Sequence, residues 1–469
     1  MHTKKVLLVK YGELSLRKGN RKLFEHALLD TIRANLKPLN NEHLRVSREQ
    51  GRFLIEDTSG DLDTASVLPL IRRIFGIAGF CHAVKTTMRN IDDLCEVAND
   101  FFAAQIAEAQ SGFEGTRGYL HVPPEKRGVA PGFEGTRDHL HVPPENDLAL
   151  PASRECSATH TCPRQKGASP PEKRGFAPLA SFKVETKRSD KNYPLTSTEV
   201  SAEIGAKILT SAEKAGTNLK VDVHTPDITL WVEIRNDVYF YITGERGEGG
   251  LPYGLSGKGV LLLSGGFDSP VAGYLAARRG VEIVAVYFHS PPFVSERAAD
   301  KVKDIASQLA KYTSRVKLCV LPFTETQVFL KENTPHEKLT IFLKRAMLHI
   351  ASRLADRERA LCLITGDAVG QVASQTIHSL AAVESAAAFP VLRPLAASDK
   401  QEIMDTAKRI GTYEISARPY EDCCTVFVAR HPENKPNFRA IERMESRIFA
   451  ELSPIMDNAL NNAEFFDII

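Results

Sequence analysis

The sequence lacks a long apolar run, paired cysteines and a strong net charge. Across its 469 residues no apolar stretch approaches the ~18 residues that a membrane span requires, and the apolar run near the N-terminus is too short for a signal peptide. The eight cysteines are scattered and form no Cys-x-x-Cys pair, which argues against a disulfide-rich secreted domain. We therefore expect a cytoplasmic protein that has no contact with a membrane.

Charge and metal ligands are equally sparse. The chain has 60 Lys+Arg against 58 Asp+Glu, a formal net charge of +2, so affinity for nucleic acid would have to come from local basic patches. Cys156, His160 and Cys162 come nearest to a Cys/His metal cluster, but we expect their segment to be unfolded and predict no metal site. With 43% hydrophobic residues, the chain is an ordinary globular one with room for about three domains.

Strands and helices alternate in two parts of the N-terminal half. Apolar spacing predicts a strand over 4–10, a helix over 20–36, a strand over 52–56 and a helix over 65–75. The alternation resumes with a strand at 181–187, a helix at 197–215 and strands at 221–224 and 232–243. This split pattern indicates small α+β domains, and we place the first at residues 1–60 and the second at 61–245.

A repetitive segment interrupts the second of these domains. Residues 112–125 recur with few changes as 132–145, and residues 123–131 recur as 170–178. Each copy carries paired prolines, glycines and few branched apolar side chains, so it cannot bury a core. We predict a disordered insertion over 111–180, which its host domain tolerates because the free energy of loop closure grows only logarithmically with length.

The C-terminal part, residues 246–469, has a third pattern. Continuous apolar runs at 260–263, 281–288, 316–321 and 362–365 alternate with helical spacing at 270–279, 295–312 and 339–359. Unbroken apolar strands separated by helices are typical of a doubly wound parallel sheet. Ligands of such sheets bind at the carboxyl ends of the strands.

The first of these strands runs into Ser264-Gly265-Gly266-Phe267-Asp268-Ser269-Pro270. Two adjacent glycines let main-chain N–H groups approach an anion, the two serine hydroxyls add donors, and the helix that begins here presents its positive end. The sequence therefore predicts a phosphate-binding loop. It is not of the Walker type, because the only comparable stretch, 252–259, has proline at its first position and glycine at its last.

This loop resembles that of the ATP pyrophosphatases, which split ATP into AMP and pyrophosphate to adenylate a substrate oxygen. Four further blocks, at 287–293, 365–376, 393–403 and 420–424, resemble the ThiI family of tRNA uridine 4-sulfurtransferases. Tyr11-Gly12-Glu13-Leu14 with Lys18-Gly19-Asn20-Arg21 is similar to the family's ferredoxin-like domain, and the segments that flank the insertion are similar to its THUMP RNA-binding domain. The resemblance covers all of the chain except about 111–180.

The resemblance implies a reaction, its cofactors and a set of site residues. The family adenylates O4 of uridine 8 in tRNA with ATP and Mg²⁺ and then attacks C4 with persulfide sulfur. Carried over, Leu262 and Leu263 line the adenine side, and Tyr287 and Phe288 contact the adenosine. The pyrophosphate is held by Ser264, Gly265, Gly266 and Ser269, and further nucleotide contacts come from Gly366 and Gln375. A magnesium-linked or orienting role falls to Asp268. The charge of the phosphates is offset by Lys400, with Lys344 or Arg345.

Sulfur transfer falls to the adjacent pair Cys423 and Cys424. In an extended segment their side chains point to opposite faces, so at most one reaches the nucleotide. Cys423 matches the family cysteine that resolves a disulfide or carries sulfur, while Cys424 and a role as inert thiols stay open. Only 45 residues follow Cys424, too few for the rhodanese domain of longer members, so we expect a separate persulfide donor such as a cysteine desulfurase, and a link to thiamine thiazole synthesis is put in doubt.

Recognition of tRNA would fall to the N-terminal domains. Structured RNA is bound largely through its backbone charge and shape, and two groups of basic residues lie there in the sequence. The candidates are Lys10, Arg17, Lys18 and Arg21 near Tyr11, and Lys183, Arg188 and Lys191 after the insertion. A homodimer is a further expectation from the family.

Two other functions compete with this interpretation. One is a related enzyme that adenylates a small molecule or uses an iron–sulfur cluster, but Cys-x-x-Cys ligands are missing. The other is an RNA-binding protein with an inactive nucleotide site, which the intact loop and Lys400 argue against.

The repetitive insertion yields the first testable prediction. Deleting residues 112–178 is expected to leave thiolation of tRNA intact, because a segment without a core contributes nothing to the folded domains. Nucleoside analysis of tRNA treated with the deletion variant and with the full chain measures this. A large loss of activity in the variant would show that the repeat has been recruited to function.

Overall fold

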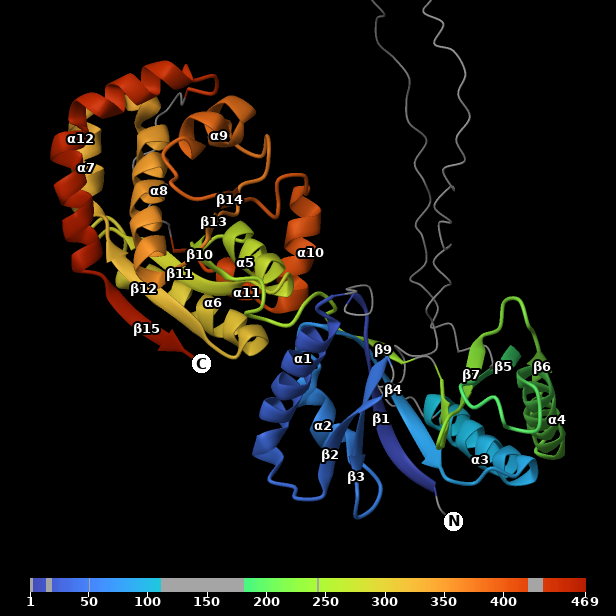
Figure 1. The fold of residues 1–469 in the computed structure, drawn as a ribbon. Coiled ribbons are helices and arrows are strands. Elements are labelled where there is room, and N and C mark those ends of the chain that lie inside the picture. The colour runs from blue at the N-terminus through green and yellow to red at the C-terminus, as the bar shows by residue number, and fades with distance from the viewer. Residues whose placement is uncertain (1–2, 14–18, 50, 111–180, 243, 421–432) are drawn as a thin grey trace, which may run out of the picture.

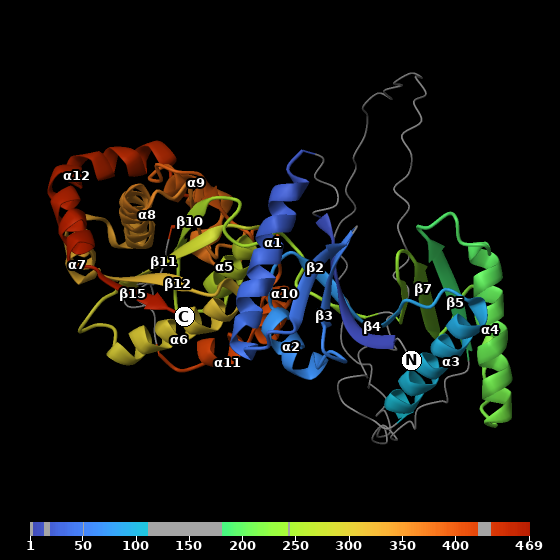
Figure 2. The same ribbon diagram turned by 60° about the horizontal axis from the view of Figure 1, so that its bottom comes forward.

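The structure is a computed structural model, and it describes residues 3–13, 19–49, 51–110, 181–242, 244–420 and 433–469. The predicted insertion at 111–180, the cysteine pair Cys423 and Cys424, and the basic residues Arg17 and Lys18 lie outside the described residues. The described chain forms two bodies, each built on one sheet, which are joined through residues 245–257 (Figures 1 and 2). No helix in these ranges is long and apolar enough to cross a membrane.

The N-terminal body is a single nine-stranded sheet in the order β2-β3-β1-β4-β8-β7-β5-β6, with β9 beside β4. Its strands are β1 (Thr3–Tyr11), β2 (Leu44–Glu49), β3 (Arg52–Asp57), β4 (Ile77–Thr86), β5 (Ser181–Arg188), β6 (Lys220–Val221), β7 (Ile228–Ile234), β8 (Val238–Tyr241) and β9 (Glu245–Arg246). Its helices are α1 (Arg21–Leu36), the 3-10 turn η2 (Lys37–Leu39), α2 (Thr64–Ile71), α3 (Ile91–Gln110) and α4 (Ser197–Lys214). The two small α+β units expected from the sequence thus share one sheet.

The long strand β4 joins the two halves of this sheet. It pairs antiparallel with β1 from Thr3 to Tyr11 and then with β8. Alternation along β4 puts Phe80 and Val84 on one face, where Phe80 packs beneath α1 and α2 and Val84 beneath α3 and α4. All four described helices of this body therefore cover the same face of the sheet (Figure 2).

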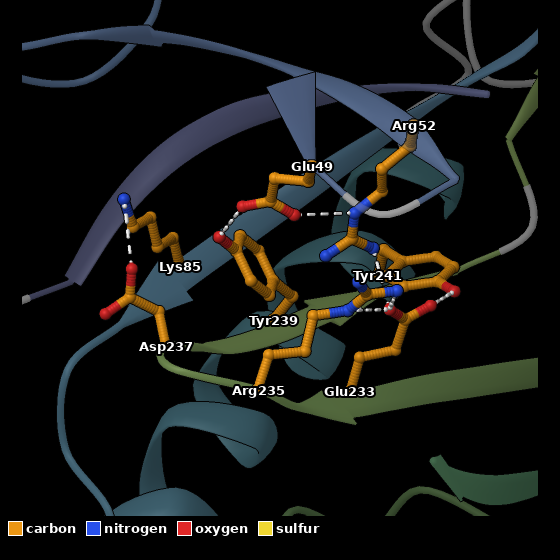
Figure 3. A network of polar contacts seen from close by, with 8 residues as sticks. All are labelled: Glu49, Arg52, Lys85, Glu233, Arg235, Asp237, Tyr239 and Tyr241. Carbon is orange, nitrogen blue, oxygen red and sulfur yellow. Dashed lines mark hydrogen bonds and ion pairs between the residues drawn. The ribbon is translucent and has the colours of Figure 1, made fainter. Parts of the chain in front are cut away.

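The opposite face curls over itself and closes on a polar network (Figure 3). Arg52 on β3 lies 2.8 Å from Glu233 on β7, although four strand spacings of ~4.8 Å would separate these strands by roughly 19 Å in a flat sheet. Arg52 also lies 2.9 Å from Glu49 and covers the ring of Tyr239 at 4.5 Å. Only strong curvature brings these groups together.

Three sequence predictions for this body need correction. The helix predicted over 65–75 ends at Ile71, because the following residues turn into β4. The strand predicted over 232–243 is a hairpin of β7 and β8, since Asn236 and Asp237 favour a turn and Arg235 N donates to Asp237 O at 3.0 Å. The strand predicted over 221–224 is reduced to the two residues of β6, because Asp222 accepts main-chain N–H groups from His224 and Thr225 and closes a turn.

The C-terminal body is a six-stranded sheet in the order β14-β13-β10-β11-β12-β15. Its strands are β10 (Lys258–Leu262), β11 (Glu282–His289), β12 (Val316–Pro322), β13 (Cys362–Ile364), β14 (Val391–Leu392) and β15 (Glu464–Ile468). Its helices are α5 (Asp268–Arg278), α6 (Glu296–Thr313), α7 (Thr324–Asn333), η3 (His336–Lys338), α8 (Leu339–Glu358), η4 (Ala373–Gln375), α9 (Ile377–Glu384), α10 (Lys400–Ile410), α11 (Tyr413–Ser416) and α12 (Phe438–Asn461).

Helices cover both faces of this second sheet, as the doubly wound prediction requires. One core lies between the sheet and α5, α6 and α10, and the other between the sheet and α7, α8, α9 and α12 (Figure 1). Strands β10 to β14 are mutually parallel. The exception is β15, which adds antiparallel to the edge strand β12.

A short linker holds the two bodies together through helix α5. On one side Gly249 exchanges main-chain hydrogen bonds with Gly76 and Ile77, each at 2.7 Å, and on the other Arg278 Nε donates to Glu248 O at 2.7 Å. Gly250 has φ +76°, and a Cβ there would lie 2.1 Å from Arg278 O, so only glycine permits this approach. The linker is therefore packed against the C-terminal end of α5.

Side chains reinforce this joint. Tyr274 of α5 and Arg409 of α10 both donate to the Glu248 carboxylate, and Phe75 of the N-terminal body packs against the rings of Tyr274 and Tyr312, with centroids 5.4 and 6.0 Å away. The C-terminal parts of α5 and α10 are thus fixed to the linker and the N-terminal body.

The curled sheet leads to a prediction about stability. Replacing Arg52, which is 3% exposed, by alanine removes one of the two cations beside the buried Glu233 carboxylate and an ion-pair partner of Glu49. The loss is expected to cost about 3 kcal/mol, the lower end of the range for a broken buried pair, because Arg235 still lies 3.0 Å from Glu233. Trp231, the one tryptophan of the chain, lies on β7 and reports unfolding of this body by fluorescence in urea. Asp30→Ala, which removes the 76% exposed carboxylate of a 4.0 Å ion pair on α1, is the control and should change stability by less than ~0.5 kcal/mol. Equal effects of the two substitutions would contradict a structural role for the curled face.

Candidate active site

The topology of the second sheet singles out one crevice. Strand β10 lies between β11 on one side and β13 on the other, and the chain passes from β10 to β11 and β12 before crossing back to β13. The order of the strands therefore reverses between β10 and β13. In open α/β sheets ligands bind at the carboxyl ends of the strands at such a switch point.

The predicted phosphate loop lies at this point. It connects the end of β10 to the start of α5, and its two serines are bonded to each other: Ser264 N donates to Ser269 Oγ at 2.8 Å, and the two hydroxyl oxygens lie 3.1 Å apart. Gly266 N donates to Ser264 Oγ at 3.3 Å. These contacts hold the loop in a tight turn at the N-terminus of α5, where unpaired main-chain N–H groups and the helix dipole favour an anion.

The neighbouring strand packs onto the loop through Gly366, which follows β13. A Cβ at this position would lie 2.7 Å from the main-chain nitrogen of Ser269 and 2.8 Å from the carbonyl carbon of Asp268. Any side chain would push the segment after β13 away from the first turn of α5. The requirement for glycine here is thus one of close approach, as expected for a cradle around phosphates.

Asp268 and Lys400 meet at the mouth of the loop. Lys400 Nζ donates to Asp268 Oδ1 at 2.7 Å, and Gln371 Nε2 donates to Asp268 Oδ2 at 3.1 Å. Each residue of the ion pair opens its own helix, since Asp268 begins α5 and Lys400 begins α10 behind the capping residue Asp399. The structure therefore brings together two side chains that the sequence separates by 132 positions.

A second cluster centres on Asp367, which sequence reasoning missed. Lys344 Nζ donates to Asp367 Oδ1 at 3.0 Å and Gln375 Nε2 at 3.3 Å, while Arg393 Nε lies 3.8 Å from Oδ2. Burial raises the pKa of the Asp367 carboxyl, but Lys344 and then Arg393 outweigh it and hold the pKa below its usual value. The predicted nucleotide residues Lys344 and Gln375 thus meet at one ionised carboxylate, next in the chain to Gly366.

Arg345 does not share this position. Its guanidinium is 2% exposed and is bonded to Glu445 of α12, to Ala382 O and to Ser385. Burial alone would raise the pKa of Glu445, but His349 and Arg345 outweigh it and lower the pKa to about 2. Consecutive helical residues point ~100° apart, so Lys344 faces the site while Arg345 joins α8 to α9 and α12. Of the two residues left open by the sequence, the geometry favours Lys344.

The predicted adenosine contacts lie inside the protein. Tyr287 is 1% and Phe288 4% exposed, and their side chains belong to the cores on opposite faces of the sheet. Leu263 is 2% exposed, and Leu262 packs against the core beneath α7, α8, α9 and α12. Contacts of Tyr287 and Phe288 with a nucleotide would therefore have to come from main-chain atoms.

The basic residues of the N-terminal body have mixed surroundings. Lys10 lies over the ring of Tyr241 at 4.5 Å, Arg21 Nε lies 2.6 Å from Glu25, and Lys183 lies 2.8 Å from Glu185. Arg188 donates to the carbonyl oxygens of Tyr193 and Leu195, at 2.8 and 2.5 Å. Lys191 is exposed. Arg188 thus braces the loop after β5, whereas Lys10, Lys183 and Lys191 present charge at the surface or near it.

The described thiols are shielded. Cys81, Cys95 and Cys319 are buried and Cys362 is half-buried. Burial raises the pKa of Cys81 and Cys362, that of Cys95 to about 11 and that of Cys319 to about 12. In the described ranges no group of three or more His, Cys, Asp or Glu is arranged for a metal ion.

A phosphate loop at the switch point of a parallel sheet, with paired charges around it, defines a nucleotide-binding α/β protein of the ATP pyrophosphatase class. Three family matches follow the chain in order: the ThiI ferredoxin-like domain at residues 6–81, the THUMP domain at 167–243 and the thiamine biosynthesis protein (ThiI) at 254–449. The ferredoxin-like match extends through the first half of β4.

Relatives and solved structures agree with these matches. A probable tRNA sulfurtransferase of Lachnoclostridium phytofermentans is 38% identical over 464 residues, 99% of each chain, and one of Halothermothrix orenii is 47% identical over 291 residues, 62% of this chain and 74% of its own. A solved 4-thiouridine synthetase, in complex with RNA and bound ATP, is 30% identical with a TM-score of 0.75 and covers 99% of this chain and 100% of its own. The chain belongs to the ThiI family of tRNA sulfurtransferases.

The close approach at Gly366 gives a prediction about ATP. Gly366→Ala is expected to weaken ATP binding by roughly 5- to 150-fold, because overpacking of this size costs ~1–3 kcal/mol and 1.4 kcal/mol is a factor of ten. Titration calorimetry with ATP measures the Kd directly. Gly205→Ala on α4 is the control, since its Cβ would meet nothing nearer than 4.0 Å. An unchanged Kd in the Gly366 variant would show that the strand ends do not shape the nucleotide site.

Proposed function

We propose that this enzyme converts uridine 8 of tRNA to 4-thiouridine in two steps, with ATP consumed in the first. The observation that carries the proposal is the Ser264–Ser269 loop, packed against Gly366 at the switch point, in a chain 30% identical over its length to a solved 4-thiouridine synthetase. The family match and the geometry of the phosphate loop both support this chemistry.

The two steps follow from the chemistry of the pyrimidine. The C4 oxygen of uracil is a poor leaving group, so O4 first attacks the α-phosphorus of ATP and pyrophosphate departs. The terminal sulfur of a persulfide then attacks C4, and AMP leaves with O4. A second cysteine thiol then attacks the sulfur of the cysteine that carried the persulfide. The S–S bond to the transferred sulfur breaks, which leaves that sulfur on C4 and a disulfide between the carrier cysteine and the attacking cysteine. Cys423 is proposed to act as the resolving or sulfur-carrying thiol.

The described residues suit the first step. Main-chain N–H groups at the start of α5 and the hydroxyls of Ser264 and Ser269 would bind the pyrophosphate, and Lys400 beside Asp268 and Lys344 beside Asp367 would supply positive charge as charge builds on the leaving group. Asp268 would contribute one carboxylate oxygen to Mg²⁺, which takes most of its remaining ligands from phosphates and water.

The partners follow from the same scheme. Lys10, Lys183 and Lys191 are proposed to contact the tRNA backbone, and Arg17, Lys18 and Arg21 extend this set by their sequence positions. A cysteine desulfurase or another persulfide-bearing protein is proposed as the sulfur donor. A homodimer and a contribution to thiamine thiazole synthesis stay predictions.

Reconstitution tests the proposal. Purified protein is incubated with unmodified tRNA, ATP, Mg²⁺, cysteine and a cysteine desulfurase, and AMP and 4-thiouridine are both measured. The wild-type chain is expected to form 4-thiouridine and to form AMP faster in the presence of tRNA. Asp268→Ala should lower both products at least tenfold, since it removes the group that orients Lys400 and the metal, whereas Cys423→Ala should abolish 4-thiouridine and keep the AMP.

Two variants serve as controls, and the products separate the competing functions. Asp300→Ala removes an exposed carboxylate on α6 and should change neither product, and Cys424→Ala should keep thiolation if Cys423 is the transfer thiol. AMP that forms with tRNA but without 4-thiouridine points to a wrong sulfur donor. Absence of both products would favour an RNA-binding protein with an inactive nucleotide site.

A further inference from the structure

Helix α6 carries a buried lysine that the scheme above does not use. Lys301 is 4% exposed and lies on the face of α6 that packs on the sheet, with Ala298, Val302 and Ile305 in the adjoining cores. An ammonium group in such surroundings is costly unless it is hydrogen-bonded. The hydrogen bonds of the Lys301 ammonium group therefore show which part of the chain it stabilises.

Lys301 is bonded to the main chain of a distant segment. Its Nζ donates to Arg418 O at 3.0 Å and to Tyr420 O at 3.3 Å. These two carbonyls flank Pro419, whose ring fixes its own φ and restricts the residue before it. One buried ammonium thus fixes the direction of the chain over three consecutive residues.

The same segment is tied to the nucleotide loop. Ser416 Oγ donates to Gly266 O at 3.1 Å, and the ring of Tyr413 packs on the ring of Phe267 with centroids 5.2 Å apart. Residues 413–420 therefore run from the phosphate loop to α6, and each end of this stretch is fixed by side chains.

Further contacts with α6 support this attachment. Gln308 Nε2 donates to Ile410 O at 2.7 Å, and the Arg418 guanidinium is paired with Asp304. Among the residues that make these contacts, Lys301 is buried, whereas the side chains of Arg418 and Asp304 are 42% and 50% exposed. Exposed pairs contribute little, so Lys301 is the main polar contact between α6 and the chain near Tyr420, whose ring also packs against the core beneath α7, α8, α9 and α12.

We propose that Lys301 is a positioning residue for sulfur transfer, which holds the chain that leads to Cys423 beside the nucleotide loop. Cys423 follows Tyr420 by three residues, and three residues extend at most about 11 Å. The position of Tyr420 therefore bounds the region that the chain allows Cys423 to reach. This inference rests on the proposed function, and it assigns Lys301 to the second step rather than to adenylation.

Lys301→Met tests the assignment, because methionine fills similar space but donates no hydrogen bond. In the reconstituted reaction the variant is expected to form AMP with tRNA within about threefold of wild type and to form 4-thiouridine at least tenfold more slowly. Lys301→Arg keeps donors at this position and should restore part of the thiolation. Lys303→Met, which removes a more exposed lysine two residues along the same helix, is the matched control and should change neither rate.

The same measurements can overturn the inference. A parallel fall of AMP and 4-thiouridine in Lys301→Met, with a lower melting midpoint and no rescue by arginine, would show a purely structural lysine. Unchanged thiolation in Lys301→Met would show that the contact has no role. If Lys301→Met is insoluble, the comparison passes to Lys301→Gln with the same criteria. Failure of the proposed function is distinct, because it would appear in the wild-type chain.

Discussion

The contact between Gly366 and the first turn of α5 is the constraint on which the candidate site depends. It fixes the distance between the start of α5 and the segment that follows β13, at the switch point of the sheet. The phosphate loop lies on one side of this contact and the cluster around Asp367 on the other. The two carboxylates, Asp268 and Asp367, are therefore positioned by one approach of two main chains, whereas Lys400 and Lys344 reach them from α10 and α8.

Helix α5 extends this constraint across the molecule. Its first turn forms the nucleotide loop, while its last turn is bonded to the linker and, through Arg279, to Glu13 of the N-terminal body. Helix α10 repeats the arrangement, since it begins with Lys400 at the site and carries Arg409, beside Glu248, near its end. The orientation of the N-terminal body relative to the nucleotide loop is consequently set by two rigid helices rather than by a flexible tether.

Local patterns in the sequence were sufficient for the loop and for most elements of the second sheet. Ser264 to Pro270 are contiguous, and the strands around them are unbroken apolar runs, so spacing alone predicts both. The assignment of Asp268 and Lys400 to one nucleotide site came from the family resemblance and not from spacing, and their ion pair is seen only in the structure.

What the sequence did not show depends on contacts between distant residues. The curled sheet joins Arg52 to Glu233 across 181 positions, and no local pattern encodes that curvature. Lys344 and Arg345 are adjacent and chemically alike, and only the packing of α12 against α8 distinguishes them. Asp367 stood inside a recognised block, and its place next to Gly366 was a usable signal. Lys301 gave none, because an amphipathic helix with one lysine on its apolar side is common.

The burial of the described cysteines has a consequence for the fidelity of sulfur handling. A cysteine accepts sulfane sulfur only as its thiolate, and a thiol whose pKa is raised well above neutrality is almost fully protonated in the cell. Cys95 and Cys319, with pKa values of about 11 and 12, and the buried Cys81 therefore offer a persulfide no competing acceptor. Burial keeps these three thiols of the described scaffold protonated, so they do not draw sulfur into the core of the enzyme that must deliver it.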